Sequence, residues 1–289
     1  MTLPLQEKDF KKGIAPRGRI SLEFAADGDG RSYLRRQFAA YPFHVCKVQY
    51  PDAAEPGLAT LYAQSCSGGI YEHDDLSIEL TARRGANVHF TTQASTIVHG
   101  MAHGTARQSI QIVAEENTYL EFLPDPQILF PQSWLMSAVR VVVAETATVV
   151  MCDAFLLPDP SCGSGVPHHY CSSLAVEDSH GRQLAADRLT LTSRSFAEGR
   201  PGVLGRYRAQ ATLLVITQNP AITAIQARIR DLGTVSEQTA VGVTQLPNTA
   251  GYMCRVLAPD GVSLKRAINT IWRIVRQELK GHEPEVRRK

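Results

Sequence analysis

Hydrophobic and polar residues alternate along several stretches of this chain. In "LSIELTA", Leu76, Ile78 and Leu80 alternate with polar residues, and this period of two is typical of a strand with one buried face. The same alternation occurs in "SIQIVAEENTYLEFL", "AVRVVVAETATVVM" and "DRLTLTSRSF", with short polar turns such as "EEN" between the runs. Strands joined by short turns at near-regular spacing predict a mainly β chain that is rich in antiparallel pairs.

Helical periodicity occurs in two segments near the end of the chain, residues 219–232 and 263–280. In both, apolar residues recur every three or four positions, which predicts a helix with one buried face. We expect Asn219 and Ser263 to cap the two helices. The apolar stripes consist of Ile222, Ile225, Ile229 and Leu232 in the first helix and of Leu264, Ala267, Ile268, Ile271, Val275 and Leu279 in the second. The basic residues of the second helix, Arg276 included, are predicted to face largely into solvent.

Composition and charge exclude several classes of protein. The 289 residues are 44% hydrophobic and 20% charged, with a formal net charge of +2, as in an ordinary globular protein. We therefore predict one domain over residues 1–289. Lys and Arg are not concentrated in any stretch, which argues against nucleic acid or a membrane as partner. The chain contains no GxxxxGK[ST], no GxGxxG in a strand-to-helix context and no GxSxG, so the known motifs for nucleotide binding and serine catalysis are missing.

The six cysteines are scattered and form no CxxC motif, so a disulfide framework is not expected. The first residues, "MTLPLQEKDFKK", lack the pattern of a signal peptide, and we expect a cytoplasmic protein. The segment 157–169, "LPDPSCGSGVPHH", is rich in Pro, Gly and Ser and predicts a flexible surface loop.

Metal binding is the chemistry with most support in the residues themselves. The candidate ligands between positions 72 and 103 are Glu72, His73, Asp74, His99 and His103. A helix would place His99 and His103 on one face, but Gly100 and Gly104 disfavour a helix, so a shared ion would require a bent loop. Two interpretations follow: a metal site, which would suit a metal-dependent hydrolase, or surface histidines on a loop. Asp74 follows a Gly pair and is expected to lie in the turn that leads into the strand at Leu76.

Several longer stretches, in this order, resemble a known family. They are "GGIYEHDDLSIELTARRGANVHFTTQAST", "YLEFLPDPQILFPQSW" and "GYMCRVLAPDGVSLKRAINTIWRIVRQELKG". Together they resemble the urease accessory protein UreD (UreH) family from about Gly18 to Gly281. The stretch "PDPSCGS" after Asp153 and the ending "EVRRK" depart from the family's usual sequence. The resemblance is therefore to a divergent member.

The resemblance implies a β-helix-like fold of many strands with two helices, and it implies no catalysis. UreD-type proteins are urease maturation chaperones that act with UreF and the GTPase UreG on apo-urease. No tightly bound cofactor is implied, and nickel would contact this chain at most transiently, with Asp74 as the first candidate. Structural or partner-binding roles are expected for Gly68, Gly69, Thr91, Thr92, Leu123, Pro124, Ile128, Asp187 and Arg188. The alternatives are the metal-dependent hydrolase and a UreD-like scaffold that no longer serves urease.

Overall fold

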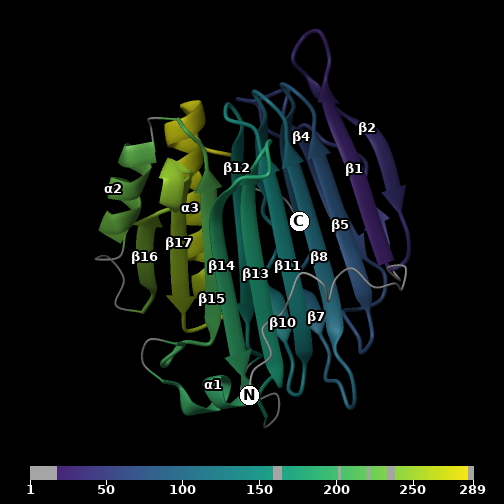
Figure 1. The fold of residues 1–289 in the computed structure, drawn as a ribbon, viewed down its shortest axis with the longest axis vertical. Helices are drawn as coiled ribbons and strands as arrows, with labels where there is room; N and C mark the ends of the chain where they lie inside the picture. The colour runs from purple at the N-terminus through teal and green to yellow at the C-terminus, as the bar shows by residue number, and fades with distance from the viewer. Residues whose placement is uncertain (1–17, 159–164, 201–202, 220–221, 233–237, 286–289) are drawn as a thin grey trace.

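A computed structural model describes residues 18–158, 165–200, 203–219, 222–232 and 238–285, which form two packed β-sheets with helices against one of them (Figure 1). In these residues sheet A has seven strands, in the order β14 (Gln183–Thr192), β13 (His169–Asp178), β11 (Trp134–Val143), β8 (Ala106–Ala114), β5 (Asp75–Ala82), β1 (Gly18–Ala26) and β2 (Ser32–Ala39). Sheet B has ten described strands. Eight follow in the order β16 (Ala240–Gln245), β17 (Gly251–Ala258), β15 (Ala209–Ile216), β12 (Thr148–Leu156), β9 (Tyr119–Phe122), β6 (Asn87–Thr92), β4 (Ala59–Ser65) and β3 (Phe43–Val45). The other two are β10 (Gln127–Leu129), which pairs with β12, and β7 (Thr96–Val98), which pairs with β10.

The chain passes repeatedly from one sheet to the other and so builds a solenoid of about four turns. The central ladders of both sheets are parallel, and Ile78, Ile110 and Val139 stand in register across β5, β8 and β11. This arrangement confirms the β-helix-like fold class. The short turns that suggested hairpins, such as the one between β8 and β9, instead connect strands of opposite sheets. Antiparallel pairs occur toward the margins, as in β1–β2, β13–β14 and β15–β17.

The interior of the solenoid is filled by the inward faces of both sheets. Phe90 and Phe122 stack at 5.2 Å between ring centroids, and aliphatic residues of sheet A, such as Leu80 and Ile112, are buried opposite them. Burial of apolar surface on this scale is the main stabilising term of the fold. Polar side chains inside this core are therefore costly unless they are hydrogen-bonded or paired.

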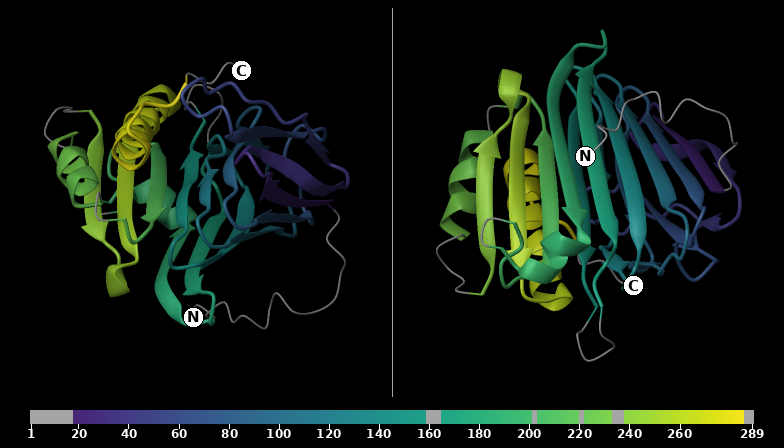
Figure 2. Two further views of the ribbon diagram at one scale, coloured as in Figure 1. Left: turned by 90° about the horizontal axis from the view of Figure 1, so that it is seen from above. Right: turned by 60° about the horizontal axis from the view of Figure 1, so that its bottom comes forward.

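Two long helices cover the outer face of sheet B (Figure 2). They are α2 (Ile222–Leu232) and α3 (Gly261–Lys280), and both confirm the predicted segments, although Pro220 lies outside the described residues. Ile225 and Ile229 of α2 are buried against β15, β17 and α3 in one apolar cluster. The predicted cap of α3 was wrong, because the Asp260 carboxylate accepts from the backbone N–H of Ser263.

Smaller features complete the described chain. A short helix that was not predicted, α1 (Ser193–Glu198), is capped by Thr192, and a 3-10 turn spans Pro247–Thr249. Of the predicted loop 157–169, residues 159–164 lie outside the described residues. The single-domain assignment stays a prediction. Within the described residues no helix combines the length and apolarity needed to cross a membrane.

Candidate functional site

The predicted metal-binding cluster is a set of loop contacts in the structure. Both oxygens of Glu72 accept from backbone N–H groups, Oε1 from His103 at 2.6 Å and Oε2 from Ala102 at 3.3 Å. The hydrogen bond from His103 lowers the pKa of Glu72 below its ordinary value. The ring of His99 stacks on Tyr71 at 4.3 Å between centroids. Glu72 thus fastens the loop 102–104 to the turn before β5.

Among the described residues no group of three or more His, Cys, Asp or Glu side chains is placed to hold a metal ion. Asp74 accepts from the backbone N–H of Tyr71 at 2.8 Å, which is the predicted turn role. His73 has a positive φ of 67° and is exposed. A transient contact between nickel and these residues stays a prediction, but the hydrolase alternative has no assembled site here.

The remaining predicted residues fall on both faces of sheet B and on sheet A. Thr91 points outward and donates to the carbonyl of Leu123 at 2.7 Å, whereas the hydroxyl of Thr92 accepts from the backbone N–H of Asp125 at 2.9 Å. Ile128 lies in β10, between β7 and β12. Asp187 and its neighbour Arg188 lie on opposite faces of β14, so only Asp187 reaches the interior. The structural or partner roles of all these residues stay predictions.

A row of three hollows crosses the protein from the α3 side to β14. The first, the outer cleft, has a volume of about 280 Å³ and lies between α3 and the 123–126 segment. The second, the inner cavity of about 70 Å³, lies between the two sheets and shares Pro124 and Asp125 with the outer cleft. The third, the rim cavity of about 20 Å³, shares Val139, Met151 and Asp153 with the inner cavity. Each hollow therefore shares part of its lining with the next.

Asp153 stands at the centre of this row. It points inward from β12 and accepts from Ser172 Oγ at 2.7 Å and from the Tyr170 hydroxyl at 3.2 and 3.3 Å, both on β13. Burial raises the pKa of Asp153 above its ordinary value, although these two hydrogen bonds oppose the rise. Asp153 is half-buried as a residue and lines two cavities. A carboxylate in this position can take up a cation or a proton.

Further polar groups line the inner cavity on both sides of Asp153. Gln127 of β10 donates through Nε2 to Oε1 of Gln108 in β8 at 2.7 Å. The side-chain oxygen Oε1 of Gln127 is buried without a hydrogen-bond partner. Ser137 of β11 lies in the same wall. Buried polar atoms are nearly always satisfied, so an unpaired amide oxygen beside a cavity points to a polar guest such as water or a cation.

Each end of the row carries an aspartate with a basic partner. At the outer cleft, Lys265 Nζ of α3 lies 3.9 Å from Asp125. At the rim cavity, Arg255 of β17 approaches both oxygens of Asp187 at 2.6 Å. Asp125, Asp153 and Asp187 thus mark the beginning, middle and end of one polar row through the solenoid.

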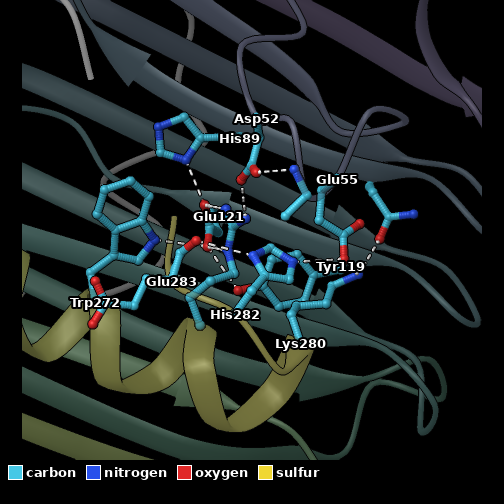
Figure 3. A network of polar contacts seen from close by, with 12 residues as sticks. Asp52, Glu55, His89, Tyr119, Glu121, Trp272, Lys280, His282 and Glu283 are labelled. Atoms are coloured by element: carbon cyan, nitrogen blue, oxygen red, sulfur yellow. Dashed lines mark hydrogen bonds and ion pairs between the residues drawn. The ribbon is translucent and has the colours of Figure 1, made fainter. Parts of the chain in front are cut away.

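A buried ion-pair network holds α3 on sheet B beside the outer cleft (Figure 3). Arg276 of α3 donates to both oxygens of Glu121 on β9, at 2.9 and 2.7 Å, and to Asp52 at 2.8 Å. Trp272 and Tyr119 donate to the same Glu121 oxygen. The predicted exposure of Arg276 was wrong, because its side chain is fully buried.

The network contains an ionised Glu121. Burial by itself would raise the pKa of this carboxyl, but the charge of Arg276 and the bonds from His89 and Arg276 hold it well below its usual range. His89 Nδ1 lies 2.6 Å from Glu121 Oε2, so Nδ1 carries the proton of that bond. A second cleft of about 330 Å³ lies beside His89 and Arg276, and Trp272 lines both this cleft and the outer cleft. The network therefore fixes the wall of the outer cleft.

Sequence reasoning assigned Asp187 but not Asp153 or Glu121, although one signal for these two residues was present. Asp153 is the single charge in "VVMCDAFLL", and Glu121 is the single charge in "YLEFL". A lone acid in an apolar strand is costly to bury without a partner, so such residues are candidates for function. The alternation alone does not reveal that Asp153 faces the interior and Glu121 the helix.

The fold and this interior define a class of protein: a two-sheet β-solenoid with a carboxylate-bearing polar row in its core and two helices on one sheet. The chain belongs to the UreD urease accessory protein family, whose model matches residues 16–289. Membership implies a role in urease maturation.

The chain is similar to individual members of the family over nearly the whole length of both sequences. The chain is 38% identical to urease accessory protein UreD 1 of Pseudomonas syringae pv. syringae (strain B728a), over 93% of this chain and 94% of the relative. It is 36% identical to UreD 1 of Pseudomonas syringae pv. tomato (strain DC3000), over 96% and 97% of the two chains. A third relative, UreD 1 of Methylorubrum extorquens (strain PA1), is 34% identical over 96% and 93%. All three carry the name of an accessory protein rather than of an enzyme.

Proposed function

We propose that this chain is a non-catalytic, cytoplasmic urease maturation chaperone that acts with UreF and UreG and lets nickel pass through its interior to apo-urease. The observation that supports this function is the row Asp125, Asp153 and Asp187, which crosses the solenoid through adjoining cavities. The parallel ladders of a solenoid would otherwise enclose an apolar core. A polar row through that core is a costly feature that maintenance of the fold does not require.

The chemistry of the row suits a cargo that must leave again. Its donors are single carboxylates, amides and hydroxyls, which are harder and more weakly binding toward nickel than imidazole or thiolate. A tight site would close a tetrahedral or octahedral set of ligands around the ion. Among the described residues no such set is present, so nickel would move between weak positions.

The test is reconstitution of urease from apo-urease, UreF, UreG, nickel and bicarbonate, with and without this chain. We expect Asp153→Asn to lower nickel per active site by about tenfold, a loss typical of a perturbed metal site. Glu177→Gln is the matched control, because Glu177 lies on the same strand as Ser172 but pairs with Arg140 at the surface.

Two other outcomes would change the assignment. If the complex with UreF and urease forms and Asp153→Asn transfers nickel normally, the interior row is not the route. If omission of the whole chain leaves nickel and activity unchanged, the urease role is wrong and the UreD-like scaffold alternative takes its place.

A further inference from the structure

The ion pair between Arg255 and Asp187 lies at one end of the polar row. Arg255 comes from β17 of sheet B and Asp187 from β14 of sheet A, so the pair bridges the seam between the two sheets. Asn248 donates to the carbonyl of Leu184 at 2.9 Å along the same seam. Asp187 also lines the rim cavity, and therefore it has the interior on one side and Arg255 on the other.

The charges around the rim cavity are unbalanced. Its lining includes the carboxyl groups of Asp153 and Asp187 but no Lys or Arg side chain. Arg255 supplies a positive charge to Asp187 from outside that lining. A divalent cation in the cavity would supply the same charge from the inside, so the cation and Arg255 compete for one carboxylate.

The Arg255 side chain can leave Asp187 toward solvent. The side chains of Arg255 and Asp187 are 43% and 24% exposed, so water can solvate the guanidinium as it leaves. Half-exposed ion pairs are held weakly, in contrast to the fully buried Arg276 pairs. Release of Arg255 therefore requires no rearrangement of the core.

We propose that Arg255 is a removable closure of the passage, which occupies Asp187 until a cation from the interior displaces it. This inference rests on the proposed function, because a closure has meaning only if the row conducts a cation. It assigns to Asp187 the last cation contact of the row, and to Arg255 a positioning role on that contact.

The test measures nickel binding to the full-length chain by equilibrium dialysis. Arg255→Gln frees Asp187, and we expect nickel affinity to rise about two- to fivefold, the equivalent of a partly exposed ion pair. Asp187→Asn is expected to lower affinity, and the double variant is expected to match Asp187→Asn alone. Arg255→Met, which keeps the apolar stem of the side chain, replaces Arg255→Gln if thermal melts show that the latter does not fold.

Arg140→Gln is the matched control for net charge. Arg140 pairs with Glu177 at 2.6 Å on the outer face of sheet A, with a side-chain exposure similar to that of Arg255. An equal rise in affinity for Arg140→Gln and Arg255→Gln, or no rise for Arg255→Gln, would overturn the closure. A rise in the double variant would also overturn it, because the effect would then not act through Asp187.

The closure and the proposed function can fail separately. If Asp153→Asn impairs nickel transfer to urease while Arg255→Gln leaves affinity and transfer unchanged, the passage stands and the closure is wrong. If Asp153→Asn has no effect in reconstitution, the passage itself is wrong, and the closure falls with it.

Discussion

Arg276 and Glu121 form a two-bond ion pair inside the protein although they lie 155 positions apart in the chain. Nε reaches Oε1 at 2.9 Å and Nη2 reaches Oε2 at 2.7 Å, and neither residue is exposed. The pair joins α3, at the end of the chain, to the central strand β9. The outer cleft lies directly beside this junction, so α3 both completes the fold and forms one wall of that cleft.

Removal of Arg276 should strongly destabilise the protein. Arg276→Met leaves the carboxylates of Glu121 and Asp52 buried without their cation, and we expect a loss of about 3–5 kcal/mol in the free energy of unfolding. Chemical denaturation followed by circular dichroism measures it. The control is Arg228→Met, which breaks the half-exposed pair with Glu278 and should cost about 0–1 kcal/mol. Equal losses in the two variants would contradict the role of the buried network.

Stability should depend on the ionisation of Glu121. Its pKa in the folded protein lies well below the ordinary value of 4.5, so the unfolded chain binds the proton more tightly. The contribution of Glu121 is therefore fully present above pH 4.5 and is lost as the pH falls toward the folded pKa. Thermal melts at pH values from 7 down to 3 should show that the difference in melting temperature between the native protein and Glu121→Gln becomes smaller as the pH falls. A constant difference across this range would show that Glu121 is not ionised in the fold.

The strands and long helices could be predicted because their periods, two and near 3.6, are local properties. The order in which the chain moves between the two sheets could not be predicted. A polar turn such as "EEN" suits a hairpin and a solenoid corner equally, and the choice depends on which distant strand completes the ladder. For β8 that partner is β11 rather than β9, and no local signal distinguishes the two.

The site shows the same limit. The Gly pair and the histidines drew attention to the turn at 72–74, where the structure shows loop contacts. Asp153 was visible as a lone acid, but its partners Tyr170 and Ser172 lie in a different strand. Arg276 was predicted to face solvent because it is charged and lies off the apolar stripe of its helix. Its acidic partners, Glu121 and Asp52, lie far away in the sequence, so no local pattern reveals the buried ion pair.

The Gly pair offers a test of the predicted backbone role. Gly69 has φ of 151°, and a Cβ there would lie 2.5 Å from the Ile97 carbonyl oxygen and 2.8 Å from His99 Nε2. Gly68 has φ of 76°, and a Cβ there would meet only the Tyr71 hydroxyl, at 3.4 Å. Gly69→Ala should therefore cost more than Gly68→Ala, by about 1–3 kcal/mol in the free energy of unfolding. If denaturation showed equal losses for the two variants, the backbone near Ile97 would be able to shift away from the new Cβ without a loss of stability.

The last prediction separates the two sets of residues that could contact nickel. In the loop set, backbone N–H groups already occupy the Glu72 oxygens, and the ring of His99 stacks on Tyr71. In the interior set, Asp153 borders two cavities. We therefore expect the double variant His99→Gln, His103→Gln to bind nickel as the native chain does, and Asp153→Asn to bind less, in equilibrium dialysis of the full-length chain.

The opposite result would restore the loop as the place where nickel is held. Loss of binding in the histidine variant, with normal binding in Asp153→Asn, would mean that the loop around residues 72–103 rearranges to bring imidazoles together. The structure argues against such a rearrangement, because Glu72 would first have to release the backbone of residues 102 and 103. Asp74→Asn is a further test of whether nickel is held by the loop or by the interior. Asp74 belongs to the turn and does not line the cavities, so we expect Asp74→Asn to bind nickel as the native chain does.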